Sequence, residues 1–386
     1  MDYKLRFFLR AALRFLREAD ILLLILSLIS SAFGIVLISS ILLTAEGNAL
    51  YVQIGALVIG LGLFVLFSYI DIDIIADKSV FLFFFSVLFI STLQIWGVGM
   101  GEVGNRAWLR FFEVGIQPAE VVKIPFIIIV AKMLTNNKER KTLNSFVSLI
   151  QVIFVFAVLF TLILVVSADL GSALIYLFIL IIMLFIAGVK LRWFIIGVAV
   201  VGALSPLLWI NYLTDRQRYR ILAPLFPDMI GNPEIVEDIM WQANQSVQAI
   251  SSGGFRGVGY GNGRMTQRSL IFAQHTDFVF SAAGEEFGFI GCILIVALLL
   301  AIIIRCIYVG VKSNNSLGLL VCTGVAAMLI VQMIENIGMC LALLPVIGIT
   351  LPFFSYGGSS LVTCYAAMGI VSGIKMRPKT ARFRTL

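Results

Sequence analysis

The residue best placed to do chemistry is Asp277, which follows His275 and Thr276 and stands just before a long apolar run. A carboxylate at a boundary between water and apolar wall is partly desolvated, which raises its pKa and its basicity, whereas nearby cations lower them. Proton abstraction by Asp277 is therefore within reach. Thr276 or Asp277 could equally well act as the N-cap of the following helix.

Two other charged sites interrupt apolar segments. Glu120 and Lys123 are three residues apart, so a helix would place them on one face as an ion pair. Ionisable residues within membrane spans are costly and mark functional sites by default. The alternative is a pair that only holds two helices together. Asp169 precedes Leu-Gly-Ser, and its competing interpretation is a helix N-cap.

Glu285, Glu286 and Asn336 lie in later apolar runs and could line a cavity. Adjacent carboxylates on a helix point about 100° apart, so the two glutamates do not suit a paired acid and base. We expect one glutamate to bond internally and the other to serve the site.

A glycine-dense segment, residues 253–263, contains Arg256 and precedes Arg264 and Arg268. Glycine lets backbone N–H groups approach anionic oxygens closely, and guanidinium groups bind phosphate, so the segment could bind a phosphate or pyrophosphate. The alternative is a flexible loop. His275 is the only histidine, which excludes a zinc site built on several histidines. The five cysteines contain no CxxC pair and are expected to be free thiols.

The elements that must position these residues are membrane helices. The chain has 386 residues, of which 60% are hydrophobic and only 13% are Asp, Glu, Lys or Arg. That is too little charge to cover a water-facing surface, and apolar runs of about 20 residues are typical of spanning helices. The sequence predicts an all-α polytopic membrane protein of one domain with about ten spans: 21–44, 50–70, 79–97, 119–135, 145–167, 170–189, 193–211, 278–304, 316–343 and 359–374.

The net charge of +7 does not indicate nucleic-acid binding, because the basic residues punctuate the apolar runs rather than form one patch. With a cytoplasmic N-terminus, 19 of the 28 basic residues fall on the cytoplasmic side, which is the expected bias. Both termini are thus predicted to be cytoplasmic. The N-terminal segment, residues 1–20, is amphipathic and is not expected to be cleaved as a signal peptide, so it stays as an anchor. The C-terminal tail, residues 375–386, is basic. Residues 211–276, 66 in all, form a large extracytoplasmic loop between the seventh and eighth spans, with enough apolar content to pack as short helices. A shorter outer loop, 98–118, carries Arg106 and Trp108.

The motifs resemble those of the SEDS family, the bacterial RodA, FtsW and SpoVE proteins, from the first span to the last. The segments that carry the resemblance are Gly104 to Trp108, Gln117 to Lys123, Asp169 to Ala173, Gly253-Gly254, His275 to Phe278, Gly284 to Glu286, and Leu344 to Ser360 with its Pro-Phe-Phe-Ser-Tyr-Gly-Gly-Ser-Ser ending.

The resemblance implies a peptidoglycan glycosyltransferase that polymerises the undecaprenyl-pyrophosphate-linked precursor lipid II on the outer face of the bacterial cytoplasmic membrane. It implies a class B penicillin-binding protein as partner, a divalent cation (Mg²⁺ or Mn²⁺) with unknown ligands, and Asp277 as the catalytic residue, supported by Glu120 and Lys123. The predicted substrate-binding and supporting residues are Glu120, Lys123, Arg106, Trp108, Asp169, Arg216, Arg256, His275, Glu286, Asn336, Ser355 and Ser359.

Some positions depart from the family pattern. Ser167-Ala168 replaces the usual Gln-Pro, the segment before His275 lacks a proline, and Ile347 and Thr350 stand where Thr and Pro are common. The changes affect local backbone geometry more than the charged residues. General resemblance favours the elongation branch (RodA-like) over the division branch (FtsW-like), and a sporulation role stays open.

Two further functions compete with the polymerase. A lipid-linked precursor flippase or transporter would also suit ten spans with interior charges, although the two halves show no inverted repeat and the motifs lie on one face of the membrane. A scaffold without chemistry would tolerate replacement of Asp277.

Overall fold

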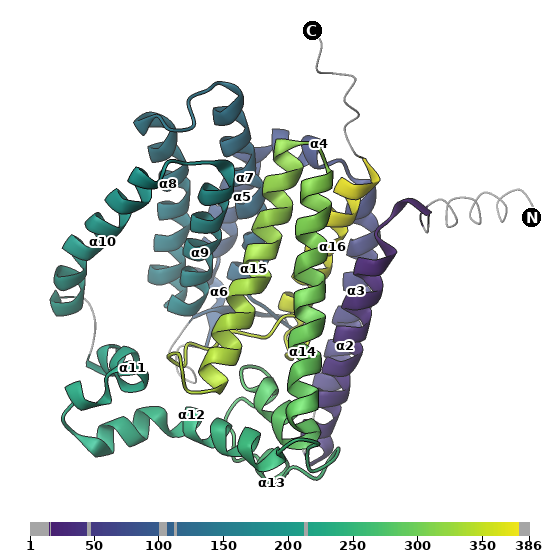
Figure 1. The fold of residues 1–386 in the computed structure, drawn as a ribbon, viewed down its shortest axis with the longest axis vertical. Helices are drawn as coiled ribbons and strands as arrows, with labels where there is room; N and C mark the ends of the chain where they lie inside the picture. The colour runs from purple at the N-terminus through teal and green to yellow at the C-terminus, as the bar shows by residue number, and fades with distance from the viewer. Residues whose placement is uncertain are drawn as a thin grey trace, which may run out of the picture.

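The computed structural model describes residues 15, 17–44, 48–99, 106–111, 114–211 and 215–377. Within these ranges, ten long helical segments cross the bundle in alternating directions (Figure 1). They are α2 (Ile21–Ile41), α3 (Ala49–Tyr69), α5 (Ser79–Ser91) continued by α6 (Leu93–Trp96), α7 (Pro118–Glu139), α8 (Phe146–Leu162) continued by the π-helical turn η2 (Ile163–Ser167), α9 (Leu170–Ala187), α10 (Leu191–Asn211), α14 (Val279–Lys312), α15 (Ser316–Cys340) and α16 (Gly358–Met376). Short helices η1 (Leu42–Thr44) and α4 (Ile72–Asp77) follow α2 and α3.

The predicted all-α membrane fold is confirmed. In the described part of the chain, nine helices are long and apolar enough to cross a membrane. The fourth predicted span, α7, is not among them because Glu120, Lys123 and Lys132 make it more polar. It nevertheless packs against α5, α9, α15 and α16, within the bundle. The chain is therefore a polytopic membrane protein.

Helices α15 and α16 form the centre of the bundle, with 78% and 83% of their most apolar windows buried. Glycines allow this packing: a Cβ added at Gly369 would lie 2.6 Å from the carbonyl oxygen of Phe64 on α3. By contrast, the corresponding window of α10 is 0% buried. In Figure 1 α10 diverges from α8 and α9 toward its C-terminal end, while Trp193 and Phe194 at its start contact Phe146 and Phe185.

At one end of the bundle, the start and end of the described chain are joined. Asp20 is fully buried and accepts hydrogen bonds from Arg305 Nε at 3.1 and 2.9 Å, with Lys375 Nζ 3.7 Å away. Its backbone N–H donates to Ser372 Oγ at 3.0 Å. Residues 20 and 372 thus lie at the same end, which agrees with an even number of crossings.

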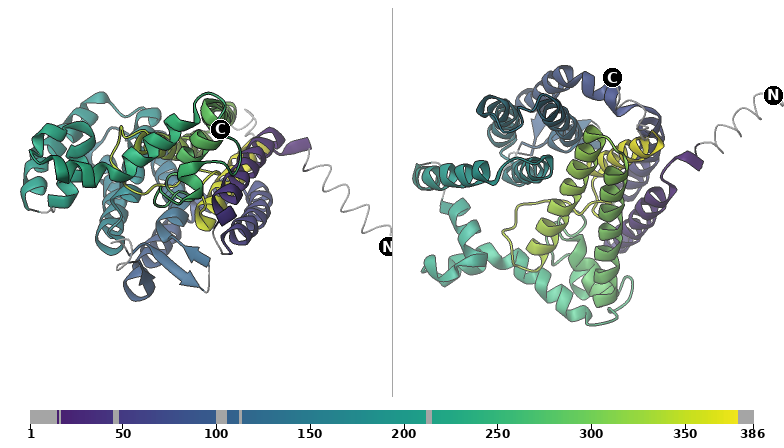
Figure 2. Two further views of the ribbon diagram at one scale, coloured as in Figure 1. Left: turned by 90° about the horizontal axis from the view of Figure 1, so that it is seen from below. Right: turned by 45° about the horizontal axis from the view of Figure 1, so that its top comes forward.

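The other end carries the long connections. Residues 215–267 form α11 (Asp215–Leu225), the 3₁₀ turn η3 (Pro227–Met229), α12 (Pro233–Gly253) and α13 (Arg264–Gln267), as expected for a loop that packs as short helices. The shorter loop contains a small antiparallel sheet that the sequence pattern did not predict. Its strands are β1 (Gly97–Val98), β2 (Trp108–Phe111) and β3 (Val114–Ile116), shown as blue arrows in the left view of Figure 2.

Candidate active site

Asp277 lies where the long segment between α10 and α14 meets the bundle, two residues before α14 begins. The side-chain amide of Asn336, fully buried on α15, donates to the main-chain carbonyl of Asp277 at 2.7 Å and to that of Ile349 at 2.7 Å. One asparagine therefore joins the segment before α14 to the loop before α16. This explains why a polar residue is retained in an apolar span.

The Asp277 carboxylate faces that same loop. A Cβ added at Gly348, whose φ is +71°, would lie 3.3 Å from Asp277 Oδ2. Burial raises the pKa of Asp277 from 3.8 to about 6, while a hydrogen bond with Thr276 opposes the rise and the negative charge of Asp169 adds to it. A base with that pKa is ionised at neutral pH and is a better proton acceptor than an ordinary aspartate.

The N-cap interpretation of Thr276 and Asp277 is wrong. The N-cap of α14 is Phe278, and no side chain caps it. Thr276 Oγ1 instead donates to the carbonyl of Ala273 at 3.2 Å. The carboxylate of Asp277 is thus not needed to start the helix.

For Asp169 the N-cap interpretation is correct. Its Oδ1 accepts from the backbone N–H of Ser172 at 2.9 Å at the start of α9, after Ala168 adopts a left-handed φ of 53°. Its Oδ2 accepts from Ser172 Oγ at 2.7 Å and from Gln117 Nε2 at 2.9 Å. Asp169 therefore also connects α9 to the start of α7. Burial is the largest cause of its raised pKa, and Glu120 adds to it.

Gly171 brings this turn against the loop that faces Asp277. A Cβ at position 171 would lie 2.7 Å from the carbonyl oxygen of Ile347. That distance is too short for a real contact, so any residue other than glycine would force the backbone to shift. Ile347 is next to Gly348, the residue that faces the Asp277 carboxylate. The Asp-Leu-Gly turn therefore supports the catalytic candidate through the backbone of residues 347–348.

Glu120 and Lys123 form the predicted ion pair near the start of α7, with side chains 7% and 0% exposed. Both act electrostatically on Asp169, Glu120 raising its pKa and Lys123 lowering it. The buried charges Glu120, Lys123 and Asp169 thus belong to one cluster, and Asp169 in turn acts on Asp277. The completely buried Lys123 cation is held in this cluster by its carboxylate partner.

The serines of the closing motif are structural donors and acceptors. Ser355 Oγ accepts from the backbone N–H of Leu351 at 2.8 Å, and Ser359 Oγ accepts from that of Gln117 at 3.3 Å. The carbonyl of His275 accepts from the N–H of Tyr356 at 2.8 Å, and their rings lie 5.6 Å apart. These bonds tie the loop to the segment that carries Asp277. Burial lowers the pKa of His275, which favours a neutral ring.

Two residues that sequence reasoning left out of the site connect these parts. Gln117 joins Asp169 to Ser359, through the two hydrogen bonds given above. Gln53, fully buried on α3, donates to the carbonyl of Ser355 at 3.1 Å and accepts from the N–H of Gly357 at 3.1 Å. The signal for Gln53 was available, because it is an amide within an otherwise apolar span.

The glycine-dense segment is a packed turn, so the flexible-loop interpretation is wrong. Its glycines allow close approach to α14: a Cβ at Gly253 would lie 2.0 Å from the Gly284 carbonyl oxygen, and one at Gly257 would lie 2.2 Å from that of Glu286. The N–H groups of Val258 and Gly259 donate to the carbonyls of Glu285 and Glu286, both at 3.0 Å. Those two N–H groups are thus engaged within the protein.

Both glutamates on α14 bond internally, whereas we expected only one to do so. Glu285 accepts from the backbone N–H groups of Met265 and Thr266 at 2.7 and 2.8 Å. Glu286 accepts from Gln267 Nε2 at 3.1 Å. Their shared role in the structure is to hold α13 against the kink of α14 at Gly288, where φ is +66°.

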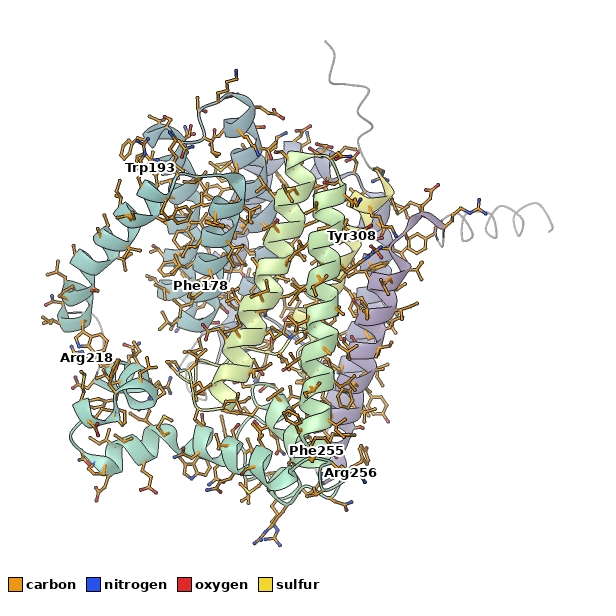
Figure 3. The ribbon with its side chains drawn as sticks, in the orientation of Figure 1. Phe178, Trp193, Arg218, Phe255, Arg256 and Tyr308 are labelled. Carbon is orange, nitrogen blue, oxygen red and sulfur yellow. The ribbon has the colours of Figure 1, made fainter. Side chains whose placement is uncertain are left out.

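The predicted arginines and Trp108 lie around the same end of the molecule. Arg106 is half-buried and its N–H donates to the carbonyl of Ser167 at 2.9 Å. Trp108 on β2 packs on Gly115. Arg256 is exposed at the end opposite Trp193 and Tyr308 (Figure 3). Arg216 lies on α11, and its side chain is outside the described part of the structure.

Chemically, the arrangement provides one carboxylate with a raised pKa that interacts electrostatically, through Asp169, with the buried cluster of Glu120, Lys123 and Asp169. Within the described ranges, no three His, Cys, Asp or Glu side chains come together as metal ligands. Asp169 and Glu120 already bind neighbouring side chains. Among the described residues, Asp169 and Glu120 are therefore not available as the core of a metal cage.

The chain is similar to known proteins over most of its length. The family described as cell cycle protein, FtsW/RodA/SpoVE, matches residues 19–380. The peptidoglycan glycosyltransferase MrdB of Escherichia coli strain K12 is 30% identical over 332 residues, covering 85% of each chain. The probable peptidoglycan glycosyltransferase FtsW of Trichlorobacter lovleyi is 32% identical over 95% of this chain and 97% of its own length.

Solved structures share the fold. One, described as the structural coordination of polymerization and crosslinking by a peptidoglycan synthase complex, has a TM-score of 0.78 and 27% identity, covering 92% of this chain and 97% of the other. A mutant of the rod shape determining protein RodA from Thermus thermophilus has a TM-score of 0.69 and 25% identity. The match covers 94% of this chain and 99% of the RodA chain.

Proposed function

The chain belongs to the FtsW/RodA/SpoVE family, and from this premise we propose that it is a peptidoglycan glycosyltransferase that polymerises lipid II. The observation that carries the catalytic assignment is Asp277, a carboxylate with a pKa of about 6 that caps no helix and is positioned by Asn336. A purely structural aspartate would not need a raised pKa together with a main chain held in place by Asn336.

In the proposed reaction, the Asp277 carboxylate takes the proton of the acceptor sugar hydroxyl. The hydroxyl oxygen attacks the anomeric carbon of the donor glycan, forming the new glycosidic C–O bond. The C–O bond to pyrophosphate breaks, and undecaprenyl pyrophosphate leaves with the electron pair. A positioned base of this kind contributes about 10²- to 10⁴-fold.

Charge builds on the departing pyrophosphate, and stabilising it is the larger electrostatic task. We assign this role to the outer arginines, of which Arg256 is exposed and Arg106 half-buried. The divalent cation stays a prediction. The buried carboxylates described above do not fit a resident metal, so the proposed steps use the chain's own residues.

Three further assignments are part of the proposal. The chain sits in the bacterial cytoplasmic membrane with Asp277 on the extracytoplasmic side, as the basic residues predict. Its partner is a class B penicillin-binding protein, which the similarity to a peptidoglycan synthase complex supports. It acts in cell elongation: relatives named MrdB and FtsW are about equally identical, and likeness to RodA structures supports this branch over division.

The test is glycan polymer formed from lipid II by purified Asp277→Asn protein, alone and with a partner transpeptidase. We expect a loss of about 100-fold or more, with the fold retained in a thermal melt. The matched control is Asp228→Asn, an exposed aspartate of η3 that should leave the rate unchanged. A flippase would move lipid II without making polymer, and a scaffold would tolerate Asp277→Asn in cells; either result would overturn the assignment.

A further inference from the structure

A buried hydroxyl joins helix α12 to both α14 and α15. Ser246 of α12 is fully buried, and its Oγ donates to the main-chain carbonyl of Cys340 at 2.6 Å. The same Oγ is hydrogen-bonded to Ser281 Oγ on α14, which is also fully buried. A carbonyl can only accept, so the Ser246 proton is used at Cys340, and Ser281 is the donor to Ser246. The hydrogen bonds therefore run in one order, from α14 through α12 to α15.

The acceptor of the Ser246 proton is the end of a helix. Cys340 is the last residue of α15, so its carbonyl is one of the four that a helix leaves without an internal partner. The chain reverses directly after it, with Ala342 at a φ of +57°, and leads into the loop that carries Gly348. Ser246 thus fixes the point from which the loop that faces the Asp277 carboxylate departs.

Both contacts of Ser246 lie close to the groups that place Asp277. Ser281 is in the first turn of α14, four residues after Asp277. Cys340 is four residues after Asn336, which puts the two on one face of α15. Cys340 Sγ also lies 3.8 Å from the Asp277 carbonyl oxygen, the atom that accepts from Asn336. One hydroxyl on α12 is therefore linked to both sides of the catalytic candidate.

Helix α12 is attached to the bundle along one face of its second half. The buried residues of α12 are Ala243, Ser246, Ala249 and Gly253. Their spacing of three or four residues places them on one face of the helix. That face packs on α14, where a Cβ added at Gly284 would lie 2.9 Å from Ile250. Ser246 is the hydrogen-bonding residue of this packed face.

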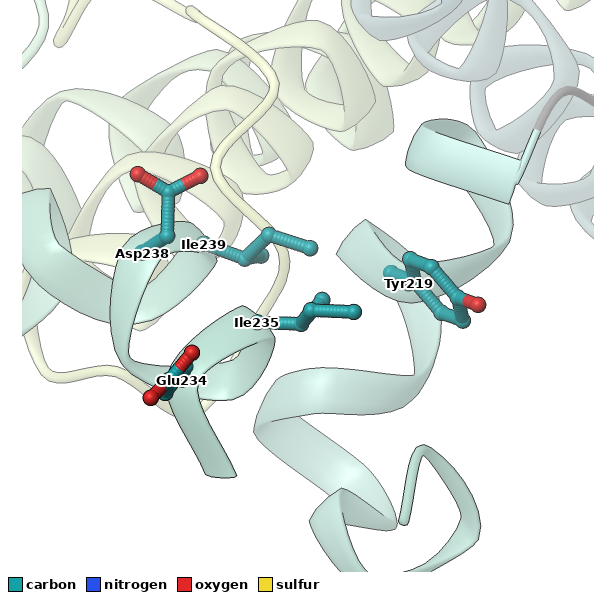
Figure 4. Close-up of a pocket in the computed structure, with 5 residues that line it drawn as sticks. All are labelled: Tyr219, Glu234, Ile235, Asp238 and Ile239. Carbon is teal, nitrogen blue, oxygen red and sulfur yellow. The ribbon is translucent and has the colours of Figure 1, made fainter. Parts of the chain in front are cut away.

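The first half of α12 is held less closely. None of the residues 233–242 is buried. Figure 4 shows Ile235 and Ile239 pointing toward Tyr219 of α11, and these side chains line a cavity of about 510 Å³. Because this half is not close-packed, the position of α12 relative to α14 and α15 depends on the face that carries Ser246.

We propose that Ser246 is a positioning residue for the glycosyl transfer, because it sets the separation between Asp277 and Gly348. It does so through Ser281 at the start of α14 and through the carbonyl at the end of α15. The inference rests on the proposed function. A base must lie within hydrogen-bonding distance of the proton that it takes, and a misplacement of about 1 Å can cost about 100-fold in rate. Ser246 touches no reacting atom and acts through the backbone on either side of the base.

The test measures kcat and KM for polymer formation from lipid II by full-length Ser246→Ala protein in detergent. We expect kcat to fall about tenfold and KM to change by less than about twofold, because the base is displaced while the substrate-binding groups stay in place. Ser281→Ala keeps the bond from Ser246 to the end of α15, and it should lower kcat about threefold, the scale of one neutral hydrogen bond.

The matched control is Ser251→Ala. Ser251 is an exposed serine of the same helix, and its Oγ donates to the carbonyl of Gln248 on that helix at 3.0 Å. This variant loses a hydroxyl of α12 without touching α14 or α15. It should keep the kcat and KM of the wild type.

The pH dependence separates positioning from stability. Burial raises the pKa of Asp277 to about 6, while Thr276 acts on it by a hydrogen bond and Asp169 by its charge. Neither of these two residues is altered in Ser246→Ala. We therefore expect the midpoint of kcat/KM against pH to move from about 6 toward the ordinary value of 3.8, as the displaced carboxylate becomes better hydrated. A variant that is only less stable would lose folded protein and keep the wild-type midpoint.

A second measurement does not require polymer formation. In Asp277→Cys protein, the rate at which monobromobimane alkylates the introduced thiol reports the access to position 277, because the five native cysteines are buried. Adding Ser246→Ala should raise this rate severalfold. Adding Ser251→Ala should leave it unchanged.

The outcomes keep the two proposals apart. Polymer formation by the wild type with equal kcat in Ser246→Ala and Ser251→Ala would overturn the inference and leave the polymerase. No polymer from the wild type, together with faster alkylation in the Ser246→Ala background, would reject the polymerase and support the role of Ser246 in placing residue 277. A lower thermal midpoint with an unchanged pH profile and alkylation rate would make Ser246 a structural contact only and overturn the inference. If Ser246→Ala does not fold, Ser281→Ala decides by the same readouts.

Discussion

Asn336 holds Asp277 by its main chain and not by its carboxylate: the amide donates to the Asp277 carbonyl at 2.7 Å and to the Ile349 carbonyl at the same distance. The carboxylate itself is not bound by Asn336 and faces Gly348. The same bonds set its position relative to Gly348, so geometry and reactivity at Asp277 are controlled by different groups.

Replacing this amide should weaken both fold and activity. Asn336→Asp keeps the size but removes both N–H donors. The Ile349 carbonyl loses its side-chain donor, and the Asp277 carbonyl keeps only Cys340 Sγ at 3.8 Å; a buried carbonyl left unpaired costs about 1–3 kcal/mol. We expect a lower thermal midpoint in detergent together with slower polymer formation. Asn315→Asp is the control on the same helix, because Asn315 accepts from Leu317 N at 3.3 Å and Asp caps as well as Asn. Equal midpoints for the two variants would contradict the bridging role.

The pKa of Asp277, raised by burial to about 6, predicts the pH dependence of the reaction. Only the ionised carboxylate accepts a proton, so kcat/KM should rise as pH increases through about 6 and then level off. Rates of polymer formation between about pH 5 and pH 8 measure this directly. A profile that is flat across this range would argue against Asp277 as the base.

The same shift has a consequence for stability. A folded-state pKa above the unfolded value means that the folded chain binds the proton more tightly, so ionisation destabilises the fold as pH rises from about 4 to 6. Asp277→Asn removes that cost. We expect the thermal midpoint of Asp277→Asn at about pH 8 to equal or exceed that of the wild type. At about pH 4.5 the advantage of the variant over the wild type should be smaller. A marked loss of stability at the higher pH would show a structural role for the carboxylate.

The buried pair at the start of α7 should behave as a unit. Lys123→Met leaves the Glu120 carboxylate buried without its cation, and breaking such a pair costs about 3–5 kcal/mol. The double variant Glu120→Gln/Lys123→Met should recover much of that loss. The control is Lys132→Met, whose partner Asp77 is 65% exposed, and which should cost less than about 1 kcal/mol. Folded yield and thermal midpoint are the measurements; equal losses in both single variants would contradict this account.

Orientation in the membrane can be tested with thiols. All five native cysteines are buried, so a single introduced cysteine can be labelled selectively. Asn232→Cys, in the outer segment before α12, should react with an impermeant maleimide in intact cells. Lys138→Cys, at the exposed end of α7, should react only after the cells are opened. The reverse pattern would place Asp277 on the cytoplasmic side and overturn the site assignment.

Some of this protein follows from its sequence alone. Apolar runs of spanning length determine the helices, because hydrocarbon leaves a backbone no partner except its own helix. Charged residues within such runs are costly, so Glu120, Lys123 and Asp169 stand out from the hydropathy pattern by themselves. Local spacing is also sufficient to predict the Glu120–Lys123 ion pair and the N-cap at Asp169, since each interaction joins residues three apart.

What joins those parts depends on contacts between distant residues, which no local pattern encodes. Gln53 meets Ser355 and Gly357 across 302 and 304 residues, and Asn336 meets Asp277 across 59. The glycine-dense segment shows the same limit: glycine permits close approach to anything, and only the folded backbone shows that Gly253 and Gly257 approach α14. The tertiary structure likewise decided that Asp277 caps no helix, because the chain enters α14 with Phe278 at the N-cap position.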